Sequence, residues 1–199
     1  MSFRIEKKYN IHQTKIPLLF KWLEKNKAIE IFQKRKINSV YFENDSSTMF
    51  YDSIEGSLPR KKIRVRKYGN NIFNYDDSNL EYKINSIEGR YKKKNKINDS
   101  SKIFKYGIFD KDYGNCFPKI EINYNRNYYK IFNKIRLTLD TDISYKRYDK
   151  KFFSKKIKEE KIVLEVKTQN TNYENYINAN INFEEIRFSK YCNAFEKIF

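Results

Sequence analysis

Hydrophobic and polar residues alternate along several short stretches of this chain. In the stretch KIRVRKY at residues 62–68, Ile63 and Val65 share one face, while Arg64 and Arg66 lie on the other. Alternation with a period of two is typical of strands that bury one face. On this basis we expect strands at residues 3–9, 38–43, 62–68, 80–85, 120–124, 135–140 and 162–168.

Two other stretches have a helical period. Residues 14–27 place apolar side chains at i, i+3, i+4 and i+7, which predicts an amphipathic helix with Thr14 as its N-cap. These apolar residues are Ile16, Leu19, Phe20 and Leu23. A second amphipathic helix is expected at about residues 183–198, and the Asn- and Lys-rich segments 89–101 and 146–160 are expected to be connections.

Strands dominate this pattern and lack regular helical crossovers between them, which favours antiparallel pairing over a doubly wound fold. The sequence therefore predicts an α+β fold, in which about eight strands form a closed antiparallel β-barrel or tunnel with flanking helices. With 199 residues, the chain is expected to form a single domain, residues 1–199.

The polar faces of the predicted strands are mostly ionic. Glu-x-Lys recurs at Glu6/Lys8, Glu81/Lys83 and Glu165/Lys167. An ordinary half-buried sheet with its charged face in water would explain any one strand. Arg is nevertheless placed on these faces although Lys is the commoner cation, and its planar fork suits phosphate oxygens. Closing the sheet would turn this ionic face into a polar lumen.

Composition supports a folded, anion-binding protein. Hydrophobic residues make up 39% of the chain and the formal net charge is +17, so the expected partner is an anion. Two distant cysteines, Cys116 and Cys192, support neither a disulfide scaffold nor a zinc cluster. No apolar run approaches the roughly 20 residues of a membrane span, and the N-terminal stretch MSFRIEKKY lacks the apolar core of a signal peptide. We therefore expect a soluble, cytoplasmic protein.

A lumen lined by Arg, Lys and a few Glu residues is suited to a polyphosphorylated ligand. The cations would neutralise phosphate charge, and the carboxylates would coordinate Mg²⁺ or Mn²⁺, which prefer oxygen ligands. Phosphoryl transfer depends mainly on positioning and charge stabilisation, so it needs no Ser, Cys or His nucleophile. We interpret His12, in the polar turn after the first strand, as a surface residue.

Taken in order, the strand motifs resemble the polyphosphate polymerase domain of the VTC (vacuolar transporter chaperone) family, within the triphosphate tunnel metalloenzyme (CYTH-like) superfamily. The resemblance covers nearly the whole chain. It is carried by RIEKKY at 4–9, NSVYFE at 38–43, RKKIRVRKYG at 60–69, LEYK at 80–83, PKIEINYNR at 118–126, IRLTLD at 135–140, LEVK at 164–167 and RFSKY at 187–191.

The resemblance implies a metal-dependent transfer of the γ-phosphate of ATP to a growing inorganic polyphosphate chain. It implies phosphate-binding, catalytic roles for Lys8, Arg64, Arg66, Lys83, Arg126, Arg136 and Lys190. Substrate-binding roles follow for Arg4, Tyr41, Lys62, Lys167 and Ser189. Glu165 is expected to be the main ligand of Mn²⁺ or Mg²⁺, with Glu6 and Glu81 as weaker ligands. Arg4 replaces the first Glu of the Glu-x-Glu-x-Lys motif of the hydrolytic branch, which favours the polymerase.

Other functions stay open at this stage. A tunnel-fold hydrolase of triphosphate or nucleotides would share the metal and the cations, and a non-catalytic polyphosphate-binding module would share the cations alone. Nucleic-acid binding could use the basic segments 90–96 and 146–158, which we interpret as mainly solvated loops, so no specific nucleic acid is expected. In eukaryotic relatives a membrane partner carries the product across a bilayer, and whether this chain has such a partner stays open.

Overall fold

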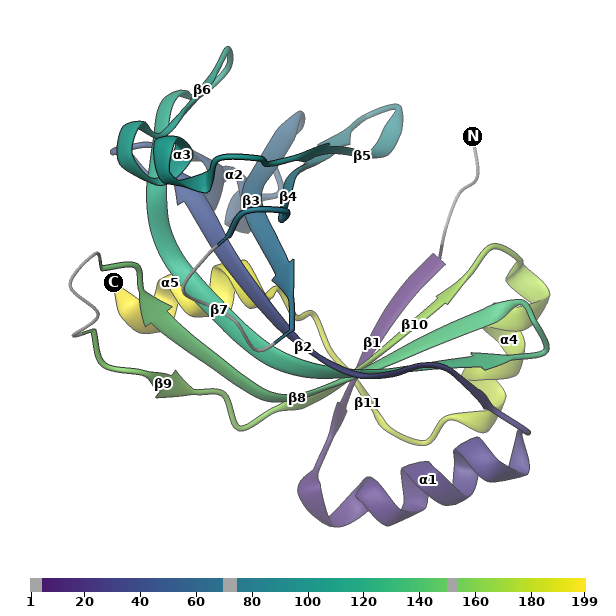
Figure 1. Ribbon diagram of the computed structural model, residues 1–199. Coiled ribbons are helices and arrows are strands. Elements are labelled where there is room, and N and C mark those ends of the chain that lie inside the picture. The colour runs from purple at the N-terminus through teal and green to yellow at the C-terminus, as the bar shows by residue number, and fades with distance from the viewer. Residues whose placement is uncertain (1–4, 70–74, 150–153) are drawn as a thin grey trace. The chain divides into compact units, whose positions relative to one another are not determined.

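The computed structural model describes residues 5–69, 75–149 and 154–199 (Figure 1). Within these ranges the protein is an α+β fold rich in antiparallel strands, as predicted. Eleven strands form one sheet in the order β11-β1-β10-β8-β7-β2-β3-β4-β5, with β6 paired to β7 and β9 paired to β8. In this part of the chain the path ends at β11 and β5 without a closing ladder, so the closed barrel of about eight strands is not observed. Alternation reports which face a strand buries, and it does not report which strands pair.

The strands are β1 (Ile5–Ile11), β2 (Ile29–Glu43), β3 (Arg60–Tyr68), β4 (Asn79–Ser86), β5 (Gly89–Lys96), β6 (Ile108–Asp110), β7 (Gly114–Ile131), β8 (Ile135–Arg147), β9 (Ile157–Lys158), β10 (Ile162–Thr168) and β11 (Glu184–Glu185). The helices are the 3₁₀ turn η1 (Gln13–Lys15), α1 (Ile16–Lys25), α2 (Thr48–Glu55), α3 (Ser100–Tyr106), α4 (Thr171–Asn180) and α5 (Lys190–Ile198). None of the helices in the described ranges is both long and apolar enough to cross a bilayer.

Several predicted boundaries were wrong for local reasons. Lys15, not Thr14, occupies the N-cap of α1, because the exposed His12 caps the preceding 3₁₀ turn. The last helix begins at Lys190 rather than near residue 183, since the Ser189 hydroxyl accepts a hydrogen bond from the backbone N–H of Cys192. Helices α2 and α4 had no counterpart among the predicted elements.

The predicted connection at residues 89–101 is instead strand β5 followed by the start of α3. Every residue of β5 pairs with a residue of β4, so the neighbouring strand supplies the ladder that the Lys-rich sequence does not signal by alternation. The second predicted connection, residues 146–160, contains the end of β8 and the short strand β9. In both segments, pairing with a neighbouring strand therefore produced strands where the polar composition predicted loops.

The chain divides into two compact units. Unit 1 comprises Met1–Arg35, Tyr124–Ile143 and Glu159–Phe188, and unit 2 comprises Lys36–Asn123, Ser144–Lys158 and Ser189–Phe199. Strands β2, β7 and β8 contribute residues to both units. Whether residues 1–199 act as a single domain stays a prediction.

In unit 1, helices α1 and α4 cover the apolar face of β1, β10 and β8 (Figure 1). Leu19 from α1 and Ile177 from α4 are buried in one cluster with Leu137 of β8 and Leu164 of β10. Burial of such side chains contributes roughly 1.5–3 kcal/mol each to folding. Because these strand residues face the helices, their immediate neighbours in sequence point to the opposite face.

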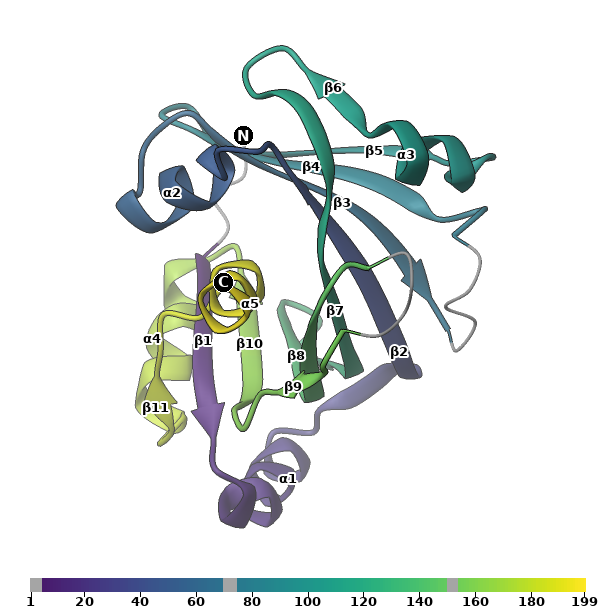
Figure 2. The same ribbon diagram turned by 90° about the vertical axis from the view of Figure 1, so that its left-hand side faces the viewer.

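In unit 2, strands β2, β3 and β4 lie side by side (Figure 2). They carry a separate apolar cluster. Phe42, Ile63 and Leu80 bury one face of these strands together with Met49 from α2. Helices α2 and α5 contact each other through stacked rings of Phe50 and Phe195, whose centroids are 4.1 Å apart. The other face of these strands is left to polar residues.

Candidate functional site

On the polar face of unit 1, the paired strands β1 and β10 form a four-residue charge cluster. In the antiparallel register Glu6 lies opposite Lys167, and Lys8 lies opposite Glu165. The Lys167 ammonium is 2.5 Å from the Glu165 carboxylate and 3.4 Å from that of Glu6, and Lys8 is 3.5 Å from Glu6. Lys8 also donates a hydrogen bond of 2.7 Å to the carbonyl of Phe188. Two carboxylates therefore share one lysine.

The electrostatics of this cluster keep Glu165 ionised. Glu165 is only 8% exposed, and such burial by itself raises a carboxyl pKa. The charges of Lys167, Arg126 and Lys8 outweigh that effect and hold the pKa of Glu165 well below its usual range. The surrounding cations thus keep the buried Glu165 side chain in its ionised form.

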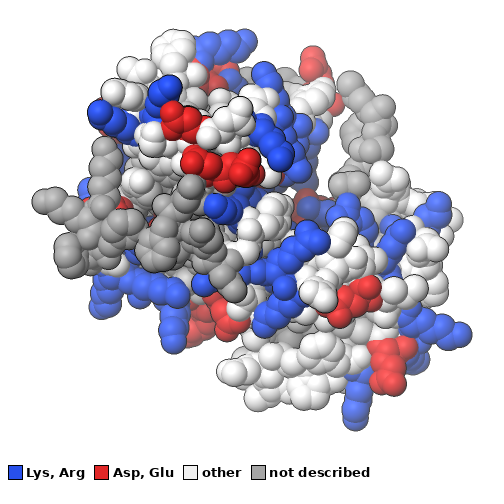
Figure 3. Space-filling view, in the orientation of Figure 1, with Lys and Arg blue, Asp and Glu red and all other residues white. Residues whose placement is uncertain are grey.

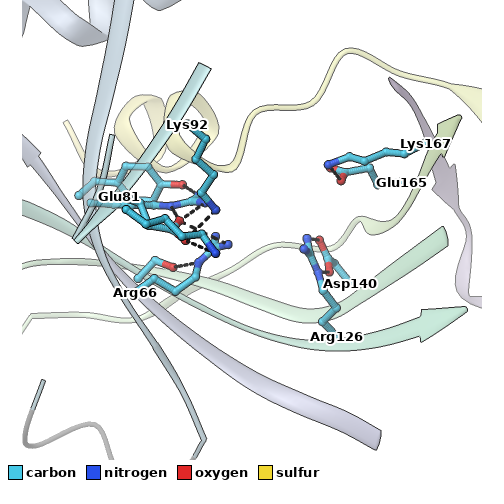
Figure 4. A network of polar contacts seen from close by, with 11 residues as sticks. Arg66, Glu81, Lys92, Arg126, Asp140, Glu165 and Lys167 are labelled. Carbon is cyan, nitrogen blue, oxygen red and sulfur yellow. Dashed lines mark hydrogen bonds and ion pairs between the residues drawn. The ribbon is translucent and has the colours of Figure 1, made fainter. Parts of the chain in front are cut away.

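A second ion pair lies on the same polar face, between β7 and β8. Arg126 donates two hydrogen bonds to the fully buried Asp140, at 2.5 Å and 2.7 Å (Figure 4). Burial would lower the pKa of Arg126, but Tyr124, Asp140 and Glu165 raise it above its ordinary value. Removing one partner of a buried pair typically costs about 3–5 kcal/mol, since the other charge is left alone. Asp140 therefore holds the Arg126 guanidinium in place.

In unit 2, the polar faces of β3, β4 and β5 place cations around Glu81, which is 1% exposed (Figure 4). The Glu81 carboxylate is 2.6 Å from an Arg64 nitrogen and 2.7 Å from Lys92. Arg66 and Lys94 each approach it to 3.9 Å. Four cations from two strands thus share one buried carboxylate.

This crowding changes three pKa values. Burial would raise the pKa of Glu81, but Arg64, Arg66 and Lys92 lower it to about 2. Burial and the two arginines lower the pKa of Lys92 to about 8, although Glu81 opposes the change. Tyr41, whose hydroxyl accepts a 2.8 Å hydrogen bond from Arg64, would also have its pKa raised by burial, yet the cations lower it to about 8. Deprotonation of Lys92 or Tyr41 would partly relieve the surplus of positive charge around Glu81.

The start of α5 adds a further group of contacts within unit 2. Lys62 donates a hydrogen bond of 3.1 Å to the Ser189 hydroxyl and lies 5.0 Å from the centre of the Tyr191 ring. Tyr191 donates to the buried carboxylate of Glu43, which also accepts the backbone N–H of Met49. Burial raises the pKa of Glu43, so this carboxyl is more easily protonated than usual. These contacts fix the beginning of α5 beside β2 and β3.

The remaining predicted site residues lie at the margins of these clusters or outside the residues that the structure describes. Lys83 is exposed, opposite Lys62 on one side and Lys92 on the other, and it lines a shallow hollow with Lys62 and Arg60. Arg136 is exposed opposite Lys167, and Lys190 is the half-buried first residue of α5. Arg4 lies outside the described residues.

Sequence reasoning missed Asp140, Lys92 and Lys94. Asp140 ends the IRLTLD motif on the same strand face as Arg136, so its parity was a usable signal. Lys92 and Lys94 lie in the basic run that we interpreted as a loop, and only the pairing of β5 with β4 reveals their position. Arg126 and Tyr124 are two residues apart on β7 and share a face, and the Arg126 guanidinium lies over the Tyr124 ring, 5.2 Å from its centre. An aromatic residue can therefore share an ionic face.

The donor set bears on metal binding. Among the described residues, no three His, Cys, Asp or Glu side chains gather closely enough to form a metal site alone. Mg²⁺ commonly uses only one or two protein carboxylates and completes its shell with phosphate oxygens and water. Glu6 and Glu165, which share Lys167, fit that requirement. Glu81 fits it poorly because four cations already surround it, and its role as a ligand stays a prediction.

Comparison with known proteins identifies the family. A sequence profile of the VTC domain matches residues 3–111 and 84–199, whereas no match was found among curated proteins. A similar fold occurs in a protein from Pyrococcus horikoshii OT3, with a TM-score of 0.57 and 13% identity, covering 97% of this chain and 96% of that one. It also occurs in a proposed adenylyl cyclase from Hippeastrum with a dominant triphosphatase activity, with a TM-score of 0.57, 14% identity, and coverage of 99% and 97%. This chain belongs to the VTC domain family.

Proposed function

We propose that this protein is a polyphosphate polymerase that transfers the γ-phosphate of ATP to a growing inorganic polyphosphate chain. Membership of the VTC domain family supports this function. The observation that carries it is the excess of cations around Glu81, because Arg64, Arg66, Lys92 and Lys94 exceed the charge of that carboxylate. A surplus of this kind favours a ligand with several negative charges.

In the proposed reaction, a terminal oxygen of the polyphosphate chain attacks the γ-phosphorus of ATP. A new P–O bond forms as the bond to the β–γ bridging oxygen breaks, and ADP leaves with that electron pair. Arg64 and Arg66 would bind phosphate oxygens through their planar forks, and Lys92 would neutralise charge that develops in transfer. We assign phosphate or product binding also to Lys62, Lys83, Arg136, Ser189 and Lys190, and to Arg4 from its motif alone.

In unit 1, we propose that Glu165 and Glu6 hold a divalent cation, Mn²⁺ or Mg²⁺. Once bound, such an ion would neutralise phosphate charge and orient phosphate oxygens. Lys8 and Lys167, which now contact these carboxylates, would be free to contact phosphate when the metal takes their place. Asp140 would keep Arg126 oriented toward the same cluster.

We place this activity in the cytoplasm. Cys116 and Cys192 are both free and buried, and reduced thiols are usual in that compartment. ATP and inorganic polyphosphate are the proposed partners.

A triphosphatase is the second candidate function. The similarity of fold to the Hippeastrum protein with its dominant triphosphatase activity favours this alternative. The two reactions differ only in the acceptor, which is water in hydrolysis and the polyphosphate end in polymerisation. The same cations and carboxylates would serve both.

The products formed from ATP distinguish these candidates. We would incubate the purified protein with ATP and Mn²⁺ or Mg²⁺, resolve the products on a polyacrylamide gel stained for polyphosphate, and measure ADP and free phosphate. A metal-dependent ladder with a matching amount of ADP is expected. ADP with equal free phosphate and no ladder would replace the polymerase with the triphosphatase. Polyphosphate binding without turnover would leave a binding module.

A further inference from the structure

Two turns of unit 1 lie side by side, the turn from α1 to β2 and the turn from β7 to β8 (Figure 1). The hydroxyl of Tyr176 donates to the side chain of Asn26 in the first turn, and its ring contacts that of Phe132 in the second, 5.3 Å between centroids. Farther along the same strands, the rings of Phe32 and Tyr128 are 5.5 Å apart. The start of β2 and the end of β7 are therefore neighbours.

Large apolar side chains are exposed at these turns. Ile29, at the start of β2, is 64% exposed, and Phe132 is 54% exposed despite its contact with Tyr176. Phe20, on the outer side of α1, is 47% exposed. Ile29, Phe132 and Phe20 have no polar group that would favour their contact with water. We call Ile29 and Phe132, with the lysines described below, the apolar–basic tip.

The backbone at Phe132 conflicts with its side chain. Phe132 and the following Asn133 both have positive φ, 51° and 55°, and the N–H of Lys134 donates to the carbonyl of Ile131 across the turn at 3.1 Å. A β-turn with both central residues left-handed favours Asn and Gly, whereas a bulky aromatic residue is strained there. Turn stability does not explain the phenyl ring. Residues that break a local rule in this way often serve binding.

Lysines flank the exposed apolar residues in the sequence. Lys25 and Lys27 flank the first turn and Lys134 follows Phe132, and all three are exposed. The other charged residues of these segments are Lys21, Lys130, Glu24 and Glu30. Cations therefore exceed anions at the tip, and its partner should carry negative charge.

We propose that the apolar–basic tip of unit 1 docks on an anionic lipid bilayer surface. The exposed apolar side chains come from separate turns, and a bilayer accepts such groups without a matching pocket. Phe132 and Ile29 would enter the interface between headgroups and acyl chains, while Lys25, Lys27 and Lys134 would contact anionic headgroups. This docking is independent of the proposed enzymatic activity.

Sedimentation with lipid vesicles tests this inference. The protein should bind vesicles of phosphatidylserine and phosphatidylcholine at least about tenfold more tightly than vesicles of phosphatidylcholine alone. Phe132→Asn should weaken binding to the anionic vesicles about tenfold, because it removes the ring. The melting temperature should stay the same or rise, since Asn tolerates the left-handed backbone. A lower melting temperature with unchanged vesicle binding would show a structural role and overturn the proposal.

Two further variants sharpen the result. Ile87→Asn makes a matched apolar-to-Asn change at a 90% exposed residue in the turn between β4 and β5 of unit 2, and it should leave vesicle binding unchanged. The double variant Lys25→Gln/Lys27→Gln should lose the preference for anionic vesicles. Failure of the wild-type protein to bind anionic vesicles, or equal loss with Ile87→Asn, would overturn the proposal. So would binding to heparin without binding to vesicles, which would point to a soluble polyanion.

Discussion

The charge clusters of the two units differ in balance. In unit 1, the carboxylates of Glu6, Asp140 and Glu165 contact or face the cations Lys8, Arg126 and Lys167, so positive and negative groups alternate across neighbouring strands. In unit 2, Glu81 is surrounded by four cations, Arg64, Arg66, Lys92 and Lys94. The near balance of charge in unit 1 leaves carboxylates that would accept a metal ion in place of a lysine contact. The excess of cations in unit 2 instead favours an anion.

The imbalance of unit 2 arises from strand order. Strand β4 provides Glu81, but its neighbours β3 and β5 provide cations at nearly every position of the same face. Lys and Arg side chains gather over β5 (Figure 3). Lys62, Lys83 and Lys92 even lie in one row across three adjacent strands, an arrangement of like charges that is destabilising unless anions compensate it. Unit 1 thus offers carboxylates suited to a metal ion, and unit 2 offers an excess of cations suited to phosphate.

The largest effect is expected for Glu165→Gln. This change keeps the size of the side chain but removes the anion that would bind the metal, and kcat/KM should fall by about a thousandfold, the upper range for one electrostatic group. Steady-state assays of ADP formation at several Mn²⁺ concentrations would measure it. Retention of more than about a tenth of the wild-type activity would contradict the assignment of the metal to unit 1.

A smaller loss is expected for Arg64→Gln in unit 2. The substitution removes a planar phosphate-binding fork and one partner of Glu81, and kcat/KM should fall about a hundredfold. Lys93→Gln is the matched control, since Lys93 lies on the opposite face of β5, opposite Tyr82, and its loss changes net charge equally. Equal effects of the two variants on activity would mean that only net charge matters, and the phosphate-binding role of the cluster would fail.

The pH dependence should be the mildest effect. The pKa values of Lys92 and Tyr41 are each about 8, so a rise in pH through that value removes a cation and creates an anion beside Arg64 and Arg66. Positive charge is present below pH 8 and is lost above it, so kcat/KM should fall about tenfold as the pH rises from about 7 to about 9. A profile of kcat/KM from about pH 6 to about pH 10 would reveal this decline. The decline of kcat/KM with rising pH should become smaller in Lys92→Arg. An unchanged decline would exclude Lys92 as its source.

Much of this arrangement could be predicted from the sequence, because strand alternation places Glu6, Lys8, Glu165 and Lys167 on one polar face. The predicted strand at residues 162–168 agrees with β10 in full. Sequence could not show that Lys167 contacts both glutamates, since this depends on the register between β1 and β10.

Strand β5 marks the limit of sequence reasoning. Its residues RYKKK alternate too weakly to signal a strand, and they form one only through the ladder with β4. Lys92 and Lys94 therefore reach Glu81 by tertiary pairing, which no local pattern encodes. Asp140 is different, because its motif and parity were visible in the sequence while its bidentate pairing with Arg126 was not.

The most direct test of the division between the units is Mn²⁺ binding followed by electron paramagnetic resonance in the presence of tripolyphosphate. We would compare the wild-type protein with Glu165→Gln and Glu81→Gln. Glu165→Gln should weaken Mn²⁺ binding at least about tenfold, whereas Glu81→Gln should leave Mn²⁺ affinity within about twofold, since Glu81 is the weaker predicted ligand and four cations already surround it. The opposite result, strong loss with Glu81→Gln and little change with Glu165→Gln, would contradict the account and move the metal to unit 2.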